Sequence, residues 1–262
     1  MYALERHDSI TELLRVEGRV VVADLAARFD VTTETIRRDL DSLEQAGLLQ
    51  RVHGGAVASG HTSVSELSFD ERQGQQTPGK AAIARAAAHL VPPTFVGSVA
   101  IDAGTTTAAV AAELASWQPS EAGRLLTVIT NAVPIAAMLQ HSPHIDLRLL
   151  GGRVRGLTSA AVGTATVEQV AALRPDIAFV GSNGISAGFG LSTPDELEGA
   201  VKTAYVRAAR RVVAVVDSTK HGAEALTRFA RLDEVDTLIT EVAPPADLAG
   251  ALAESGVEVI VA

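Results

Sequence analysis

The stretch from Val20 to Asp39, VVVADLAARFDVTTETIRRD, decides how the first part of this chain folds. Its first half carries apolar side chains at the spacing of a short helix that buries one face. These apolar residues are Val22, Leu25, Ala26 and Phe29. The next two residues, Asp30 and Val31, interrupt the pattern, so we predict a helix over 20–29 that ends in a turn.

A second helix is predicted to begin at Thr32, whose hydroxyl can accept a hydrogen bond from a free backbone N–H group. Val31 and Ile36 occupy the two positions of a hydrophobic staple around this cap. Farther along, Leu40 and Leu43 fall on the same face as Ile36, so this face of the helix should be buried.

Arg37 and Arg38 project away from that buried face. Two packed helices with an arginine-bearing edge have the geometry of a helix-turn-helix, whose second helix enters the major groove of DNA. Residues 48–56 then alternate apolar and polar side chains into a Gly-Gly turn, which is typical of a small β-hairpin. With a first helix over 3–17, in which we expect Arg6 to be a solvated surface charge, the pattern predicts a winged helix.

These residues resemble the DeoR family of bacterial transcription regulators. Arg6, Ile10 and Leu14 have the spacing of that family's first helix, and they are followed by TxxTIRRDL at 32–40 and RVHGGA at 51–56. The resemblance later extends through nearly the whole chain. It implies a DNA-binding regulator, usually a repressor, whose larger domain is similar to ribose-5-phosphate isomerase and senses a phosphorylated sugar.

Six residues are predicted to contact double-stranded operator DNA. They are Thr33, Thr35, Arg37 and Arg38 from the second helix, with Arg51 and His53 from the wing. The net charge is −9, and residues 1–57 hold seven arginines against ten acidic residues, so there is no general attraction to nucleic acid. Binding must depend on local placement of a few arginines, and we therefore expect a dimer or a tetramer.

A chain of 262 residues with 47% hydrophobic content is long enough for two domains with well-filled cores. No apolar run approaches the ~20 residues that cross a bilayer, and the first residues do not resemble a signal peptide. The sequence therefore predicts a cytoplasmic protein without membrane association. It contains no cysteine and its seven histidines are not clustered, so we expect neither a metal nor a cofactor.

Three segments are predicted: a winged helix-turn-helix over 1–57, a polar linker and docking segment over 58–79, and an effector domain over 80–262. In the last segment strand and helix signals alternate, which predicts an α/β domain with parallel strands and a ligand beyond their carboxyl ends. Strands are expected at 99–102, 127–130, 147–150, 177–180, 212–217, 237–240 and 257–261. Helices are expected at 80–90, 107–116, 133–139, 166–173, 196–211 and 245–254.

The segment Asp102-Ala103-Gly104-Thr105-Thr106-Thr107 leaves a predicted strand, turns on a glycine and enters a helix. Free N–H groups, hydroxyls and the positive end of the helix dipole would converge there, which suits a phosphate. A glycine turn with threonine caps is the alternative. The resemblance favours the phosphate, because the segment matches the family's phosphate loop; Asp102, Gly104 and the three threonines are therefore predicted effector residues.

Thr130 and Asn131 end the next predicted strand, where they could bind hydroxyls of the effector or simply begin the following helix. Asn183 stands where many members of the family carry an aspartate. It keeps the capacity for hydrogen bonds but not the charge. All three residues are predicted to contact the effector.

Glu198 and Lys202 are four residues apart on a predicted helix, and spacing alone would make them a surface pair. The resemblance implies instead that both side chains face the effector pocket. It also matches residues 217–220, DSTK, to the family's Asp-Ser-Ser-Lys element, and so adds Lys220, which could neutralise a phosphate or hold a sugar oxygen.

Two other interpretations stay open. The chain could be a sugar-phosphate isomerase with an added DNA-binding domain; Glu198 would be the main candidate for its base, because Asn183 cannot abstract a proton. Alternatively, the larger domain could be an oligomerisation scaffold that senses no ligand.

Overall fold

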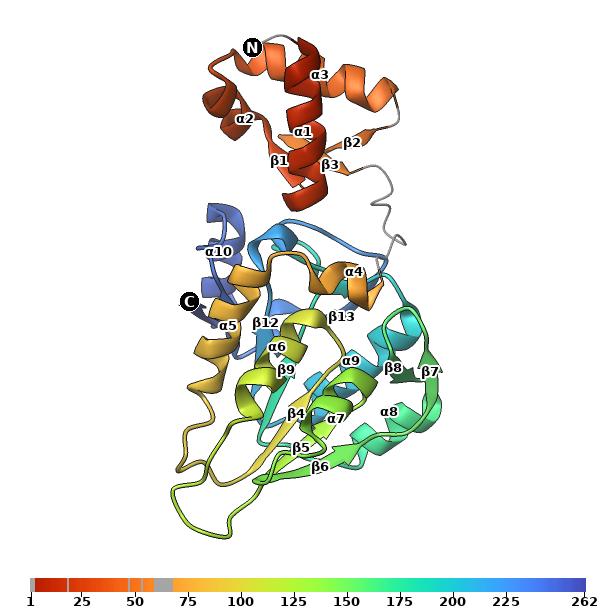
Figure 1. Ribbon diagram of the computed structural model, residues 1–262, viewed down its shortest axis with the longest axis vertical. Coiled ribbons are helices and arrows are strands. Elements are labelled where there is room, and N and C mark those ends of the chain that lie inside the picture. The colour runs from red at the N-terminus through yellow and green to blue at the C-terminus, as the bar shows by residue number, and fades with distance from the viewer. Residues whose placement is uncertain (1–2, 18, 47, 53, 59–67) are drawn as a thin grey trace. The chain divides into compact units, whose positions relative to one another are not determined.

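A computed structural model describes residues 3–17, 19–46, 48–52, 54–58 and 68–262 of the chain (Figure 1). The chain divides into two compact units, Met1–Glu66 and Leu67–Ala262. Each unit has its own hydrophobic core. Within the described ranges, no helix has both the length and the apolar character needed to cross a membrane.

The first unit is a winged helix. Its described helices are α1 (Ala3–Glu17), α2 (Val22–Phe29) and α3 (Thr33–Gln45), and its described strands are β1 (Arg19–Val21), β2 (Leu49–Val52) and β3 (Gly55–Ala58). The strands form an antiparallel sheet in the order β1-β3-β2. The prediction of a helix over 20–29 is wrong at its start: Val20 and Val21 belong to β1, because their backbones pair with Ala56 and Gly55.

The cap and the core of this unit are as predicted. The hydroxyl of Thr32 accepts a hydrogen bond from the backbone N–H of Thr35 at 3.1 Å and so caps α3. Ile36 and Leu40 of α3 are fully buried, together with Ile10 of α1. These side chains hold the three helices together.

Arg6 is not the solvated surface charge that we expected. It is 7% exposed, and its guanidinium donates to both carboxylate oxygens of Asp39, at 2.5 and 2.9 Å. His7 lies 2.9 Å from the same carboxylate. Burial acts to raise the pKa of Asp39, but hydrogen bonds and charge from Arg6 and His7 outweigh it and leave the pKa lowered. The cluster ties α1 to α3.

The second unit is built on a seven-stranded parallel sheet in the order β15-β14-β12-β9-β4-β5-β6 (Figure 1). The strands are β4 (Ser98–Ile101), β5 (Leu126–Thr130), β6 (Ile145–Leu149), β9 (Ile177–Val180), β12 (Val212–Val215), β14 (Thr237–Thr240) and β15 (Glu258–Val261). They correspond to the seven predicted strands. Their near-continuous apolar sequence is typical of parallel strands that are covered on both faces.

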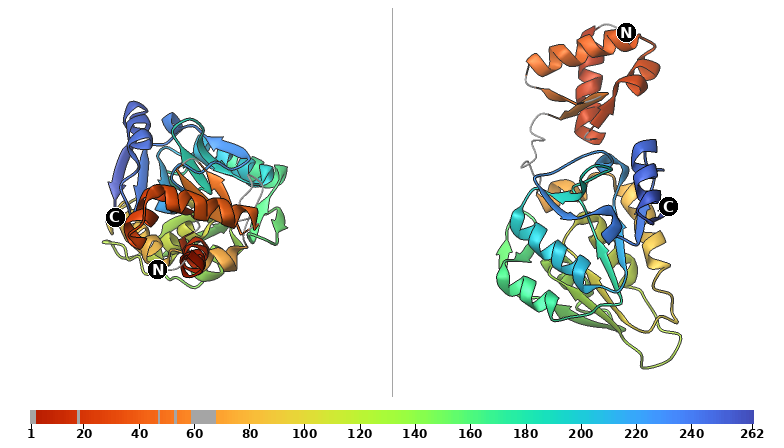
Figure 2. Two further views of the ribbon diagram at one scale, coloured as in Figure 1. Left: turned by 90° about the horizontal axis from the view of Figure 1, so that it is seen from above. Right: turned by 180° about the vertical axis from the view of Figure 1, so that it is seen from behind.

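Helices cover both faces of this sheet (Figure 2). On one face lie α5 (Thr77–Ala88), α6 (Thr105–Leu114) and α7 (Val133–Leu139); on the other lie α8 (Thr164–Ala171), α9 (Glu196–Ala208) and α10 (Ala246–Glu254). Part of the predicted linker and docking segment over 58–79 is helical. It contains α4 (Phe69–Gln73) and the start of α5, where Pro78 fits the first turn because that turn needs no N–H from it.

Several short elements of the second unit were not predicted. A hairpin pairs β7 (Arg153–Arg155) with β8 (Ala160–Val162), and a small sheet joins β10 (Gly184–Ser186), β11 (Gly190–Thr193) and β13 (Thr227–Ala230). Two 3-10 turns, η1 (Ser218–Lys220) and η2 (Leu232–Glu234), follow β12 and β13.

The strand order reverses between β4 and β9. From β4 the chain continues to β5 and β6 on one side, whereas β9, β12, β14 and β15 lie on the other side. Loops that leave the two central strands therefore diverge, and a crevice for a ligand is expected at their carboxyl ends.

Candidate functional site

A cleft opens at this crevice, entirely within the second unit. Six of the predicted effector residues line it: Gly104, Thr105, Thr106, Asn183, Lys202 and Lys220. They come from the loops after β4 and β9, from the start of α6, from α9 and from η1. The fold thus brings together residues that are far apart in the sequence.

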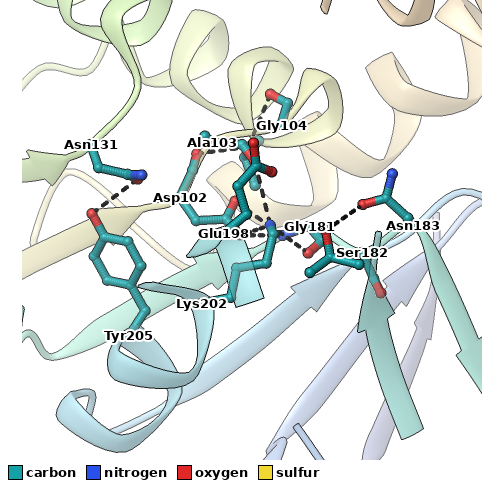
Figure 3. Close-up of polar contacts among 12 residues, drawn as sticks. Asp102, Ala103, Gly104, Asn131, Gly181, Ser182, Asn183, Glu198, Lys202 and Tyr205 are labelled. Atoms are coloured by element: carbon teal, nitrogen blue, oxygen red, sulfur yellow. Dashed lines mark hydrogen bonds and ion pairs between the residues drawn. The ribbon is translucent and has the colours of Figure 1, made fainter. Parts of the chain in front are cut away.

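Asp102 and Lys202 form a buried ion pair, and Lys202 of this pair lines the cleft (Figure 3). The Lys202 ammonium donates to the Asp102 carboxylate and, at 3.0 Å, to the backbone carbonyl of Gly181. The Gly181 N–H in turn donates to Asp102 at 3.1 Å. Burial raises the pKa of Asp102, and Lys202 and Gly181 oppose the rise. The pair ties together the ends of β4 and β9 and helix α9.

The N-terminus of α6 points its first residues into the cleft. Thr105 and Thr106 line the cleft, and the N–H groups of the first helical turn have no acceptor within the helix. A Cβ atom at Gly104 would lie 3.1 Å from the Thr107 hydroxyl, so the loop is tight there. Thr107 itself is fully buried and donates to the backbone carbonyl of Asp102 at 2.9 Å, which makes it a brace for the loop.

Two positively charged residues of the cleft were not predicted. They are Arg72, in the last turn of α4, and Lys80 on α5. Lys80 is 7% exposed, and its ammonium donates to the backbone carbonyl of Arg72 at 2.6 Å. Burial lowers the pKa of Lys80 to about 8; Asp217 opposes the shift, whereas Lys220 and Arg72 add to it. Among the described residues, Lys202 and Lys220 also line the cleft, and Asp217 is the one carboxylate in its lining. Asp102 neutralises Lys202, so Arg72, Lys80 and Lys220 against Asp217 leave an excess of positive charge that favours an anionic ligand.

Asn183 is half-buried at the edge of the cleft. Its side-chain oxygen accepts a hydrogen bond from the Thr193 hydroxyl at 3.1 Å, and its backbone N–H donates to the Ser192 carbonyl at 3.0 Å. The oxygen therefore points toward β11, and the amide NH₂ group is the part of this side chain that can serve a ligand.

Glu198 lies in a smaller, adjoining pocket with Asp102, Asn131 and Lys202. It is 5% exposed, and its carboxylate accepts hydrogen bonds from Arg155 at 3.1 Å and from the Thr158 hydroxyl. The hairpin of β7 and β8 thus holds this carboxylate.

Thr130 and Asn131 are largely engaged with the protein. Thr130 is fully buried, and its hydroxyl accepts a hydrogen bond from the Ala132 N–H at 3.1 Å. The Asn131 amide donates to the Ala161 carbonyl at 2.8 Å and accepts from the Tyr205 hydroxyl at 3.3 Å (Figure 3). Both residues position the loop after β5, and Asn131 also lines the smaller pocket.

On the first unit, α3 presents the arginines predicted to contact DNA. The side chains of Arg37 and Arg38 are 54% and 79% exposed, and each lies near Glu34, at 3.8 and 3.5 Å. Thr33 is exposed at the start of the helix, whereas the Thr35 hydroxyl lies 2.9 Å from that of Thr32. Arg37 and Arg38 are therefore available to a partner from the exposed side of the helix.

Arg51 of the wing forms an ion pair with Asp41 of α3, and its backbone N–H donates to the Glu44 carboxylate at 2.7 Å. These contacts join the wing to the end of α3. His53 lies outside the described residues.

Across the described ranges, no group of three His, Cys, Asp or Glu side chains is arranged to hold a metal ion.

A winged helix with arginines on its second helix, combined with an α/β unit whose cleft suits an anion, defines a class of ligand-responsive DNA-binding proteins. The sequence profile of the DeoR-like helix-turn-helix domain matches residues 6–62, and that of the DeoR C terminal sensor domain matches residues 75–242. The chain belongs to the DeoR family of transcriptional regulators. It is accordingly a DNA-binding regulator and not an enzyme.

Relatives align over almost the full chain. The HTH-type transcriptional repressor CsqR of Escherichia coli is 32% identical, over 97% of this chain and 94% of its own. The glycerol-3-phosphate regulon repressor of Escherichia coli is 31% identical over 98% of both chains. The lactose phosphotransferase system repressor of Lactococcus lactis is 33% identical over 90% of both.

Among solved structures, a ribose 5-phosphate isomerase A from Methanocaldococcus jannaschii is similar over 54% of this chain and 52% of its own, with 17% identity and a TM-score of 0.37.

Proposed function

We propose that this protein represses genes of sugar metabolism and that a phosphorylated sugar, bound in the cleft of the second unit, controls its affinity for operator DNA. The observation that carries the proposal is the excess of positive charge in the cleft at the ends of β4 and β9. The names of two relatives refer to glycerol-3-phosphate and to the lactose phosphotransferase system, which is consistent with this chemistry.

In the proposed complex the phosphoryl group lies at the N-terminus of α6. The N–H groups and hydroxyls of Thr105 and Thr106 donate to it, and Lys80 and Lys220 neutralise its charge. Asn183 and the smaller pocket around Glu198 are then left for hydroxyls of the sugar. Gly104 and Thr107 shape the loop, and Asp102 and Lys202 hold its base.

For DNA, the exposed positions of Arg37 and Arg38 on α3 support contact with base edges or phosphates in the major groove. Thr33 and Thr35 near the start of the helix, with Arg51 and His53 of the wing, complete the proposed contact surface. Because one subunit offers so few cations, we expect a cytoplasmic dimer or tetramer that reads two half-sites ~34 Å apart.

The test is selection of DNA sequences by the purified full chain, repeated with and without a panel of phosphorylated sugars. We expect a preferred duplex sequence and a change in its affinity with at least one phosphorylated sugar. No sequence preference under any condition would contradict DNA-binding specificity. A preference that no phosphorylated sugar alters, with no ligand raising the melting temperature, would contradict only the sensing.

A further inference from the structure

Strand β6 is an edge strand of the seven-stranded sheet, and no described strand pairs with its outer side (Figure 1). On the inner side, the His144 carbonyl accepts from β5 and the Leu150 N–H donates to β5, both at 2.8 Å. Backbone groups alternate along a strand, so those of Ile145, Leu147 and Leu149 point away from β5. The outer edge of β6 thus presents hydrogen-bonding groups to another strand.

The side chains of β6 are divided between its two faces. Ile145, Leu147 and Leu149 lie on the face covered by α7, and Leu149 is 51% exposed. Asp146 and Arg148 lie on the other face, with side chains that are 46% and 58% exposed, and they form an ion pair with each other at 3.6 Å. An exposed pair of this kind contributes little to stability, so both charges can also meet those of a second strand. An exposed edge that combines apolar residues with one charge of each sign can be complementary to itself.

We propose that two copies of this chain pair antiparallel along β6, about a two-fold axis at Leu147. In this register Leu147 faces Leu147 of the partner subunit, and Ile145 faces Leu149 of the partner subunit. On the opposite face, Asp146 meets Arg148 of the partner subunit, and symmetry repeats this ion pair. The sheets of the two subunits become one continuous sheet.

The backbone and the charges select this register. The Ile145 N–H already donates to the Ser142 carbonyl at 3.2 Å and is not available to the second copy. The N–H groups of Leu147 and Leu149 in each subunit then donate to the carbonyls of Leu147 and Ile145 in the other, which gives four main-chain hydrogen bonds. The two adjacent registers that also match hydrogen-bonding groups place Asp146 opposite its own copy or Arg148 opposite its own copy. Like charges directly opposite one another are unfavourable, so both registers are disfavoured.

The other edge of the sheet lacks this complementarity. Strand β15 has the sequence EVIV, so Glu258 is its single charged residue and the strand carries no residue of opposite charge. No pair of opposite charges is available there for a second copy. The pairing therefore belongs to β6, and it supplies the dimer that the proposed function requires.

The test is the mass of the full chain in solution, measured by light scattering or sedimentation over a range of concentrations. Asp146→Arg and Arg148→Asp each place like charges opposite one another, and each should weaken dimerisation at least about tenfold. An equimolar mixture of the two variants should recover the dimer, because each then faces its opposite charge. The double variant Asp146→Arg/Arg148→Asp should recover it too. Arg153→Asp, an exposed position on β7, is the control and should leave the mass unchanged.

A second measurement uses the absence of cysteine from the chain. Leu147→Cys should be linked to its own copy by a short bismaleimide, whereas Val96→Cys, at a position 71% exposed, should not. The pairing is overturned if both charge variants keep the wild-type mass, if their mixture stays dissociated, or if Leu147→Cys fails to cross-link. The melting temperature with phosphorylated sugars, measured on the same variants, reports ligand binding separately, so failure of the interface and failure of sensing are distinguishable.

Discussion

The Lys202 ammonium donates a hydrogen bond to the Asp102 carboxylate, and both side chains are at most 6% exposed. This hydrogen bond joins helix α9 to the end of β4. Glu198, one turn earlier on the same helix, lies in the adjoining pocket. The pair lies where the strand order reverses, so its integrity and the shape of the cleft are linked.

Removal of one member of this pair should destabilise the second unit. Lys202→Met leaves the Asp102 carboxylate buried without its counter-charge, and we expect a loss of about 3–5 kcal/mol in the free energy of unfolding. Asp102→Asn/Lys202→Met should cost less than the sum of the two single variants, with a coupling energy of at least about 1 kcal/mol. Urea unfolding followed at Trp117, which lies in this unit, measures both. Strict additivity would show that the two charges do not stabilise each other.

Binding of a phosphorylated sugar should weaken as the pH rises through about 8, which is the pKa of Lys80. Below this pH the ammonium is charged and can bind the phosphoryl group, which stays a dianion because its second pKa is ~6. Above this pH Lys80 is neutral, so binding of the phosphoryl group at pH 9 must be accompanied by uptake of a proton by Lys80. Calorimetry in buffers of different ionisation enthalpy measures that uptake, and Lys80→Arg should abolish it. Equal proton uptake by the wild type and Lys80→Arg would place the titrating group elsewhere.

Arg37→Ala or Arg38→Ala should reduce affinity for the selected operator by about 1–3 kcal/mol if the arginine binds a guanine edge. Both side chains are exposed and their contacts with Glu34 are surface pairs, so the melting temperature should hardly change. Fluorescence anisotropy with the operator and with a scrambled duplex separates two outcomes. A loss on the operator alone indicates base contact, and an equal loss on both duplexes indicates phosphate contact.

The winged helix should lose stability in acid through Asp39. Its pKa is lowered in the folded state, so the unfolded state binds more protons between the folded and the ordinary pKa. The stabilisation is present above about pH 4 and is lost as the pH falls through the folded pKa. Asp39→Asn leaves Arg6 buried without a charge partner and should cost about 3–5 kcal/mol at pH 7.

The pH dependence distinguishes this effect from a general loss of packing. The difference in melting temperature between the wild type and Asp39→Asn should shrink as the pH falls from about 4 toward the lowered folded pKa of Asp39, because the unfolded state takes up the proton first. Asp24→Asn, an exposed change on α2, serves as the control and should behave like the wild type. A difference that is constant from pH 7 to pH 3 would contradict the role of the charge.

The sequence predicted the parallel sheet because strand and helix signals alternate after residue 80. Strands such as Ile177–Val180 were found because they are buried on both faces and so appear as apolar runs. It did not predict short strands such as β7 and β10, because three residues are too few to show a strand pattern and each strand is held by its pairing with the next strand, β8 or β11. Val20 and Val21 were assigned to a helix because their strand partners, Ala56 and Gly55, are distant in the sequence. Their pairing with β3 outweighs the local helical pattern.

The candidate site was predictable where a residue follows a strand, as with Asp102 and Lys220. Lys80 had no such signal, since a single lysine in an alanine-rich helix is ordinarily solvated. Its burial follows from the packing of α5 beside the loops of the cleft. Arg6 was assigned to the surface for the same reason, because its partner, Asp39, is 33 residues away.

Asn183→Asp tests whether the ligand's negative charge lies near the edge of the cleft. In the wild type, the Asn183 oxygen is occupied by the Thr193 hydroxyl, and the amide NH₂ group remains for the ligand. An aspartate can keep the bond from Thr193, but it replaces that donor with a second acceptor and adds a negative charge. A phosphorylated sugar should then bind roughly tenfold more weakly, about 1.4 kcal/mol, and high salt should reduce the difference.

Titration calorimetry at 50 and 500 mM salt measures both the loss of affinity and its dependence on salt. Asn183→Ser, which removes the amide without adding charge, is the matched control: an equal loss in the two variants would show that a lost hydrogen bond, rather than repulsion of an anion, governs binding at this position.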